Sequence, residues 1–565
     1  MNQEKNPQMF SGGQAVVESL KVEGVKHVFG LIGSATMELF DALYDAKDIR
    51  FIGVRDERTG THMADGYARA TGQPGIIIAG QNGPGVTNLV TGIAQANAAF
   101  SPVVSLAGAV ATEHVGKDAF QEIDQQALLE TITKKTWSIK QTSKIPGILS
   151  EAFSLALTPR CGPVHINLPR DVLADSDSFG EFKKLQKTVT PVASKEDITK
   201  TIDIILSSSQ PVIIAGGGIK NSHGCQEVVN LAKILNVPIV SSAGHGDAIP
   251  FNENLYAGQM GPRGNPIASK LVKEADVILA LGTRLGFNST FFSYDNVNEH
   301  ASIIQVDIEP TALGRYFPVS IAICADAKTI AKELYNKISL KKEVAKIEKW
   351  TQNFKQARQK YLAKRDKEAE INAHPIRPTG IFKILRESLP KNSAITLDAG
   401  TLCLQATDML NYFEPPSLFT PLDFGLVGFS FACGLGAKIA RPDRPVISLM
   451  GDGGFGMTIS ELSTAVQYNI NTVTIVMNNN SWGAEKSYQR DFYGKRYIGA
   501  DIDSPPFAKI AELYGAKGFH IEKISDLKNA VLQALKCEKP VVINVQVDPD
   551  AIYSFRRDSF KHRQS

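Results

Sequence analysis

The stretch VISLMGDGG at residues 446–454 sets the architecture expected of this chain. Its first five residues predict a buried strand, residues 457–468 follow a helical period, and residues 472–477 predict a second buried strand. A strand, helix and strand in that order form a right-handed βαβ unit, in which the two parallel strands end side by side. The polar residues that follow each strand are therefore expected to face a common point.

Asp452 follows the first of these strands, and Asn479 lies in the asparagine run that follows the second. Carboxylate and amide oxygens suit Mg²⁺ or Ca²⁺, and Mg²⁺ usually completes its shell with phosphate and water. Gly453 and Gly454 would let backbone N–H groups approach a diphosphate closely. The alternative is an ordinary pair of turns, because Asp-Gly and Asn-Asn are common turn formers.

Length and composition predict a globular protein with about three domains, since 565 residues are too many for one core. Hydrophobic residues make up 43% and charged residues 21% of the chain. A formal net charge of +3 gives no reason to expect nucleic acid or an anionic membrane as a partner. A small molecule is the expected partner.

The six cysteines are scattered without metal-type spacing, which favours buried thiols in a reducing cytosol. The first residues, MNQEKNPQMFSGG, lack the pattern of a secretion signal. No apolar run approaches the roughly 20 residues that span a bilayer. These features predict a cytoplasmic location.

Two polar stretches divide the chain into segments 1–185, 195–345 and 375–565, and the second stretch, residues 341–370, predicts a long solvated helix. Short apolar runs alternate with helical periods in each segment, which predicts α/β domains with parallel sheets. The expected strands include residues 75–79, 212–215, 277–281, 303–306 and 541–547. In the middle segment, glycine turns at 216–218 and 282 favour close packing over a nucleotide site, because the full dinucleotide fingerprint is missing.

The pattern that couples GDGG to Glu461-Leu462, to the asparagine run and to Trp482-Gly483 resembles the signature of a thiamine-diphosphate enzyme superfamily. Acetohydroxyacid synthases, pyruvate oxidases and oxalyl-CoA decarboxylases belong to it. The resemblance implies three Rossmann-like or flavodoxin-like domains, which bind the pyrimidine, lie centrally and bind the diphosphate. It also implies thiamine diphosphate and Mg²⁺ as cofactors, with Asp452, the Asn479 side chain and the Ser481 carbonyl as metal ligands.

The segment RDERTGTHMADGYAR at residues 55–69 resembles the pyrimidine-binding motif of the same superfamily. Taken alone, Glu57 could be a first-turn glutamate favoured by the helix dipole. The resemblance instead implies that Glu57 hydrogen-bonds a ring nitrogen of the aminopyrimidine, a catalytic role, and that Gln121 touches the bound intermediate. It assigns cofactor contacts to Gly400, Thr401, Leu402, Gly425, Val427, Gly453, Gly454, Asn479, Gly483 and Ala484.

Within the superfamily, several motifs are most similar to the sulfoacetaldehyde acetyltransferases. These are GLIGSA at residues 30–35, GQNGPG at 80–85, WGAEK at 482–486 with Gln489, Asp491-Phe492-Tyr493 and Arg496, and FRRD at 555–558. An anionic substrate requires cationic recognition, for which arginine is well suited. The candidate substrate residues are Ile32, Gln81, Asn82, Lys486, Arg496, Arg556 and Arg557, although a solvated surface role is open for each basic residue.

The resemblance implies the reaction of sulfoacetaldehyde with phosphate to give acetyl phosphate and sulfite. Asp118-Ala119-Phe120-Gln121-Glu122 leaves open a 2-oxoacid decarboxylase or carboligase of the acetolactate synthase type. A non-catalytic cofactor-binding protein is a third alternative, which the presence of Glu57, Asp452 and Asn479 together disfavours. In relatives the cofactor lies between two subunits, so we expect a homodimer or homotetramer.

Overall fold

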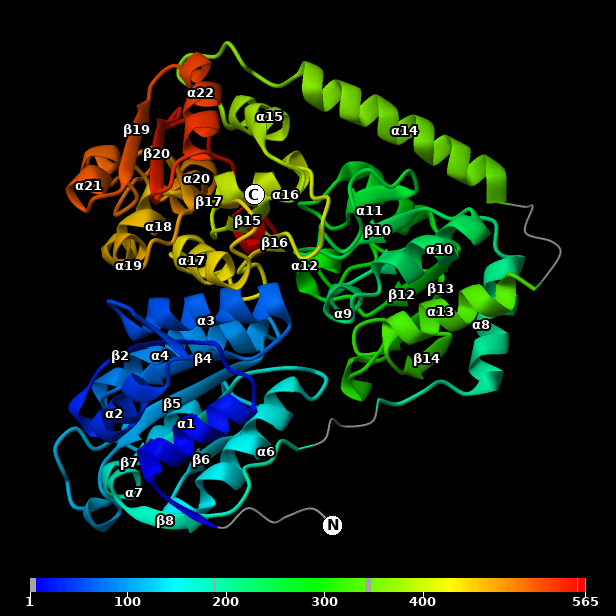
Figure 1. The fold of residues 1–565 in the computed structure, drawn as a ribbon. Helices are drawn as coiled ribbons and strands as arrows, with labels where there is room; N and C mark the ends of the chain where they lie inside the picture. Colours follow the sequence, from blue (N-terminus) through cyan, green and yellow to red (C-terminus); the bar gives the residue numbers. More distant parts are fainter. Residues whose placement is uncertain (1–6, 186–189, 341–346, 556, 564–565) are drawn as a thin grey trace.

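The computed structural model describes residues 7–185, 190–340, 347–555 and 557–563. Three six-stranded parallel sheets are flanked by helices, which confirms the predicted α/β architecture (Figure 1). A short antiparallel pair, β1 (Gln8–Ser11) with β8 (Ser176–Phe179), lies beside the N-terminal sheet. Of the helices in the described ranges, none is long and apolar enough to cross a membrane.

The N-terminal sheet has the strand order β3-β2-β4-β5-β7-β6, so its chain order is 2-1-3-4-6-5. This is a flavodoxin-like order, in which the direction of sheet growth reverses between the first and third strands. The strands are β2 (His27–Leu31), β3 (Arg50–Gly53), β4 (Gly75–Ala79), β5 (Val103–Ala109), β6 (Thr136–Ser138) and β7 (Val164–Pro169). The helices are α1 (Gly12–Val22), α2 (Met37–Asp45), α3 (Glu57–Thr71), α4 (Pro84–Ala98), α5 (Gln125–Glu130), α6 (Ile145–Leu157) and α7 (Arg170–Ala174).

The C-terminal sheet repeats this order as β16-β15-β17-β18-β20-β19. Its strands are β15 (Ala394–Leu397), β16 (Leu418–Phe419), β17 (Val446–Gly451), β18 (Val473–Asn478), β19 (Lys517–Ile521) and β20 (Val541–Gln546). Its helices are α15 (Pro378–Ser388), α16 (Thr401–Met409), α17 (Ser430–Ala440), α18 (Asp452–Gly456), α19 (Leu462–Gln467), α20 (Gly483–Phe492), α21 (Phe507–Leu513) and α22 (Ile524–Ala534). The two outer domains therefore have one topology.

The central sheet differs, because its order β11-β10-β9-β12-β13-β14 is the Rossmann order 3-2-1-4-5-6. Its strands are β9 (Pro211–Ala215), β10 (Ile239–Ser241), β11 (Tyr256–Gln259), β12 (Val277–Leu281), β13 (Ser302–Asp307) and β14 (Ile321–Cys324). Its helices are α8 (Lys195–Ser207), α9 (Gly217–Asn221), α10 (Cys225–Leu235), α11 (Pro266–Glu274), α12 (Phe287–Thr290) and α13 (Ala327–Ile338). A Cβ on Gly216 would lie 2.2 Å from the carbonyl oxygen of Gly282, so these two glycine turns pack on each other.

The outer domains meet where helix α3 packs on helix α17 (Figure 1). Asp56 caps the start of α3, and Gly72 ends it with a φ of +69°. A Cβ on Gly66 would lie 2.1 Å from the carbonyl oxygen of Cys433, and one on Gly436 would lie 1.9 Å from that of Met63. The helices come this close because each of them has a glycine where the backbone of the other approaches.

The helix predicted over residues 457–468 is confirmed in part, over 459–467, where a 3₁₀ turn leads directly into α19. The structure has the short helix α18, a 3₁₀ turn at Ile459–Glu461 and then α19. The Arg58 guanidinium donates to the carbonyl oxygen of Met457 at 3.0 Å, and the Glu461 N–H bonds instead to the carbonyl of Thr458. The Glu461 carboxylate accepts from the backbone N–H of Arg55 and from the Thr59 hydroxyl, so its side chain is bound to the N-terminal domain.

The charged stretch after the central domain forms helix α14 (Glu348–Lys367), within the predicted solvated helix. It runs along the central domain toward the C-terminal one (Figure 1). Residues 341–346 of that prediction lie outside the described residues. Trp350 and Phe354 anchor the helix, the first by donating to the carbonyl of Pro211 at 3.0 Å and the second by burial.

Candidate cofactor and metal site

The predicted diphosphate turns lie at the point where the C-terminal sheet reverses its order. Strands β15 and β17 are paired neighbours, with Leu397 beside Leu449. Gly400 and Thr401 follow β15, and Asp452 follows β17. A crevice outside the carboxyl ends of strands at such a switch point is where open α/β sheets bind ligands.

Three oxygen atoms converge at the ends of β17 and β18. The side-chain oxygen of Asn479 lies 3.2 Å from Oδ1 of Asp452 and 3.1 Å from the carbonyl oxygen of Ser481. Turned over, the amide would donate to both of those oxygens, and the orientation of an amide is assigned from its surroundings. With its oxygen inward, the group presents one carboxylate, one amide and one carbonyl oxygen, which is a donor set that Mg²⁺ accepts.

The carboxylate in this group is buried and has one side-chain donor. Asp452 is 1% exposed, and the Ser504 hydroxyl donates to its Oδ2 at 2.5 Å. Burial raises the pKa of Asp452, and the hydrogen bond from Ser504 acts in the opposite direction. A cation would stabilise the charged carboxylate more strongly than the hydroxyl does. Ser504 carries no motif in the sequence, and our sequence analysis missed it.

The glycines after Asp452 are required by their neighbours in the fold. A Cβ on Gly453 would lie 2.5 Å from the Trp482 ring, and one on Gly454 would lie 2.1 Å from Oδ2 of Asp398. Both positions therefore exclude any residue larger than glycine, even without a bound ligand. Close approach of their backbone to a diphosphate remains a prediction.

Asp398 organises the turn that carries the predicted pyrimidine contacts. Its carboxylate accepts from the N–H groups of Gly428, Phe429 and Ser430, at 3.0, 2.7 and 3.2 Å. Burial raises the pKa of Asp398 to about 6, and the backbone hydrogen bonds act in the opposite direction. Our sequence analysis predicted neither strand β15 nor a role for Asp398, which follows its last residue.

Two predicted cofactor residues, Gly425 and Val427, belong to this turn. Gly425 has a φ of +76°, which favours glycine, and a Cβ there would meet no atom within 4 Å. A Cβ on Gly454 would lie 3.3 Å from a methyl carbon of Val427. Val427 is thus next to the GDGG segment.

The remaining predicted contacts lie at the start of α20 and α16. A Cβ on Gly483 would lie 3.2 Å from the Asn479 amide and 3.5 Å from the Thr401 hydroxyl. Ala484 is buried in the first turn of α20. The side chain of Leu402 lies outside the described residues. The structure thus brings together residues predicted from four separate sequence segments.

Glu57 lies in the first turn of α3, at the end of β3 in the N-terminal sheet. It is 4% exposed, and its Oε2 accepts from the side-chain amide of Asn88 at 3.0 Å. A Cβ on Gly85 would lie 3.4 Å from Oε1 of Glu57. The carboxyl is held between α3 and α4, and Asn88 was not among the predicted site residues.

Three further predicted residues meet at the ends of β4 and β5. The Gln81 amide donates to the side-chain oxygen of Gln121, and the Asn82 amide donates to the carbonyls of Phe120 and Gln121 at 3.1 and 3.0 Å. Gln121 has a φ of +61°, which is uncommon for a residue with a side chain. Ile32, at the end of β2, is exposed. The loop of Gln121 is therefore fixed by the loop of Gln81.

Of the four basic substrate candidates, the structure describes the side chains of Lys486 and Arg496. Lys486 pairs with Asp501 at 2.6 Å, and Arg496 lies in an exposed loop after α20. Arg556 lies outside the described residues, and so does the side chain of Arg557. The preceding Phe555 packs its ring 5.8 Å from the Tyr488 ring of α20.

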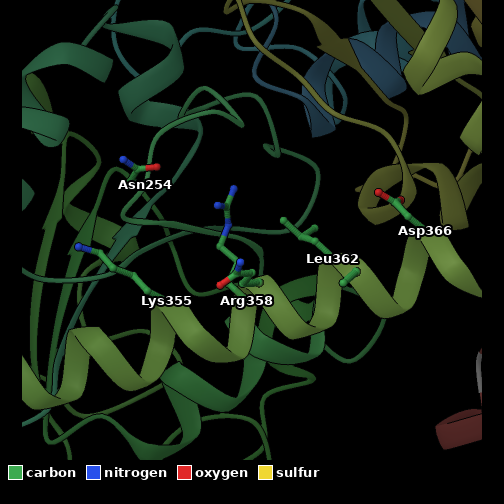
Figure 2. Close-up of a pocket in the computed structure, with 7 residues that line it drawn as sticks. Asn254, Lys355, Arg358, Leu362 and Asp366 are labelled. Atoms are coloured by element: carbon green, nitrogen blue, oxygen red, sulfur yellow. The ribbon is translucent and has the colours of Figure 1, made fainter.

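A separate hollow of about 460 Å³ lies along α14 and contains none of the predicted site residues (Figure 2). Lys355 and Arg358 give it a basic lining. Arg358 is already engaged, because it donates to the carbonyl of Phe251 at 2.7 Å and its guanidinium lies 5.1 Å from that ring. Cavity size alone thus does not locate the chemistry of this chain.

Family comparisons match all three domains. Residues 10–128 match the N-terminal TPP binding domain of thiamine pyrophosphate enzymes, residues 198–334 the central domain, and residues 398–545 the C-terminal TPP binding domain. A probable acetolactate synthase large subunit of Methanococcus aeolicus is 35% identical, covering 96% of this chain and 93% of the relative. Sulfoacetaldehyde acetyltransferases of Alcaligenes xylosoxydans xylosoxydans and Castellaniella defragrans are each 32% identical, covering 97% and 98% of this chain and 94% and 96% of the relatives.

Proposed function

The chain belongs to the thiamine pyrophosphate enzyme family, and within it we propose a sulfoacetaldehyde acetyltransferase or a close relative. The proposed reaction converts sulfoacetaldehyde and phosphate to acetyl phosphate and sulfite. It needs no outside oxidant, because the aldehyde carbon is oxidised to the acyl level while the carbon that loses sulfite is reduced to a methyl group. The carbon–sulfur bond breaks, and a bond from the acyl carbon to a phosphate oxygen forms.

The observation that carries this proposal is a contact between two motifs. Helix α20, which carries part of one motif similar to sulfoacetaldehyde acetyltransferases, lies against Phe555, the first residue of the FRRD motif. Ser554 donates to Oδ2 of Asp491 at 2.7 Å, and Phe555 packs on Tyr488. Motifs that are separate in sequence but joined in space are expected to serve one site.

The bound cofactor would supply the carbanion chemistry, while the protein provides binding, orientation and electrostatics. We propose that Asp452, Asn479 and the Ser481 carbonyl hold Mg²⁺, which fixes the diphosphate. Glu57, held by Asn88, would hydrogen-bond the aminopyrimidine and assist proton transfer there. Gln121, held by Gln81, would face the reacting carbon.

Acetolactate synthesis is the second candidate, because the relative from Methanococcus aeolicus has that name at 35% identity. One assay separates the two. The chain is incubated with thiamine diphosphate and Mg²⁺, and with either sulfoacetaldehyde plus phosphate or pyruvate. Sulfite and acetyl phosphate in equal amounts support the proposal, whereas CO₂ and acetolactate from pyruvate alone would replace it with the second candidate.

We further propose that the active unit is a homodimer or a homotetramer of paired dimers, with each site built by two subunits. In this chain Glu57 bonds to Asn88 of its own domain. Large apolar side chains are exposed at the loops of both half-sites, Phe120 in the N-terminal domain and Met457 and Ile498 in the C-terminal one. Exposed apolar surface of this kind favours a second copy as its cover.

A further inference from the structure

We infer that Ser504 is a positioning residue for the metal: its hydroxyl holds the Asp452 carboxylate in the orientation that points one oxygen at the cation. This inference rests on the proposed function, because it takes Asp452 as a metal ligand. Ser504 donates to Oδ2 of Asp452 at 2.5 Å. The other oxygen, Oδ1, is the one that lies 3.2 Å from the side-chain amide of Asn479.

A buried carboxylate needs such a partner. Asp452 is 1% exposed, so water does not orient it, and rotation about its last bond would turn Oδ1 away from the other two predicted ligands. A hydrogen bond to Oδ2 opposes that rotation and leaves Oδ1 toward Asn479 and Ser481. Partners that orient metal ligands in this way typically change affinity by 10- to 100-fold when they are removed.

Ser504 belongs to a segment that also fixes the backbone around Ser481, a second predicted ligand. We call residues 500–504 the bracing segment. The N–H of Trp482 donates to the carbonyl of Ala500 at 2.7 Å, and the N–H of Ile502 donates to that of Asn480 at 3.0 Å. Ser481, the residue between them, forms an antiparallel bridge with Asp501.

Through these contacts the bracing segment orients two of the predicted metal ligands. Its backbone sets the direction of the Ser481 carbonyl, and its Ser504 side chain sets the carboxylate of Asp452. The ion pair of Asp501 with Lys486 at 2.6 Å joins the segment to α20. Lys486 is thereby given a structural partner, whereas the sequence had suggested a substrate contact.

The test is a calorimetric titration of Mg²⁺ into the full chain with thiamine diphosphate present. We expect Ser504→Ala to weaken Mg²⁺ affinity by about 10- to 100-fold. Ser504→Thr, which keeps the hydroxyl, should retain affinity near that of the wild type. Ser504→Cys keeps the size but donates weakly, so its affinity should fall between the two.

Ser525→Ala is the matched control, because the Ser525 hydroxyl also donates to an aspartate, Asp526 at 3.1 Å, on the surface. It should leave the affinity unchanged. Equal Mg²⁺ affinity in wild type, Ser504→Ala and Ser504→Cys would overturn the inference alone. Absence of Mg²⁺ binding in the wild type would instead overturn the proposed metal site and the inference with it.

A second measurement detects a variant that is merely misfolded. Thermal midpoints are recorded without metal and then with thiamine diphosphate and Mg²⁺. Ser504→Ala should match the wild type without metal and show a smaller rise on addition, because ligand stabilisation depends on affinity. A lower midpoint without metal, with an unchanged rise, would mean that Ser504 serves the fold only, which overturns the inference.

Discussion

The two outer domains share the strand order 2-1-3-4-6-5, but different chemistry follows their strands. After β3, β4 and β5 the N-terminal domain places Glu57 and the amides of Gln81 and Gln121. After β15, β17 and β18 the C-terminal domain places glycine turns, Asp452 and Asn479. The difference teaches that topology fixes where a ligand binds, while the residues at the strand ends decide which part of it is bound.

The difference between the two domains predicts the largest loss of activity when the predicted metal ligands of the C-terminal domain are removed. Asp452→Ala and Asn479→Ala should each abolish activity, because they delete an oxygen that only this domain supplies. Calorimetry should show affinity for Mg²⁺ and thiamine diphosphate reduced by at least about a hundredfold. Asp443→Ala, an exposed aspartate of the same domain, is the control. Unchanged cofactor affinity in both variants would remove these residues from the metal site.

The corresponding change in the N-terminal domain should affect chemistry and spare binding. Glu57→Gln keeps the shape and the contact with Asn88 but loses the carboxylate, so turnover should fall roughly 10²- to 10⁴-fold. Cofactor affinity by calorimetry should stay near that of the wild type. Exchange of the thiazolium proton, followed by NMR, should slow in parallel. A variant with normal exchange and turnover would show that Glu57 only caps its helix.

Mixing the two variants tests whether the half-sites of different subunits combine. Glu57→Gln and Asp452→Ala chains, each inactive alone, are allowed to exchange subunits. A mixed dimer with shared sites has one intact site and should regain about half of the wild-type activity per dimer. Exchange is verified by mass spectrometry of tagged chains. No recovery despite exchange would place each site within a single chain.

The smallest expected effect concerns the pH dependence of stability, through Asp398. Its folded pKa, about 6, lies above the usual value near 3.9, so folding takes up a proton. The stability that this carboxyl contributes is complete below about pH 4 and is lost as pH rises through 6. From pH 5 to 7.5 the wild type should lose about 1 kcal/mol that Asp398→Asn does not lose.

Thermal midpoints of both chains without cofactor, measured across that range, check this expectation. The absolute midpoint of Asp398→Asn is expected to be lower at every pH, because an amide accepts fewer of the three backbone N–H groups. Only the difference in slope reports the titration. Parallel curves for the two chains would show that Asp398 is ionised at pH 5.

The strands and the main polar positions of the candidate site were predictable because their signals are local. The strands expected at residues 75–79 and 277–281 match β4 and β12. Parallel strands must end at one edge of a sheet, so the sequence also indicated that Asp452 and Asn479 would lie together. The predicted helix over 457–468 is helical only from 459 to 467, and Arg58 of the other outer domain donates to the carbonyl of Met457 just before it.

The sequence by itself determined three α/β domains, the family and the residues that end β17 and β18. Only the tertiary structure decided how the residues of the candidate site are held in place. Asn88 holds Glu57, Asp398 holds the turn of Val427, and Ser504 holds Asp452. A hydrogen bond between residues 30 to 52 apart leaves no periodic pattern, because it exists only once folding has buried both groups and excluded the water that would otherwise bind them.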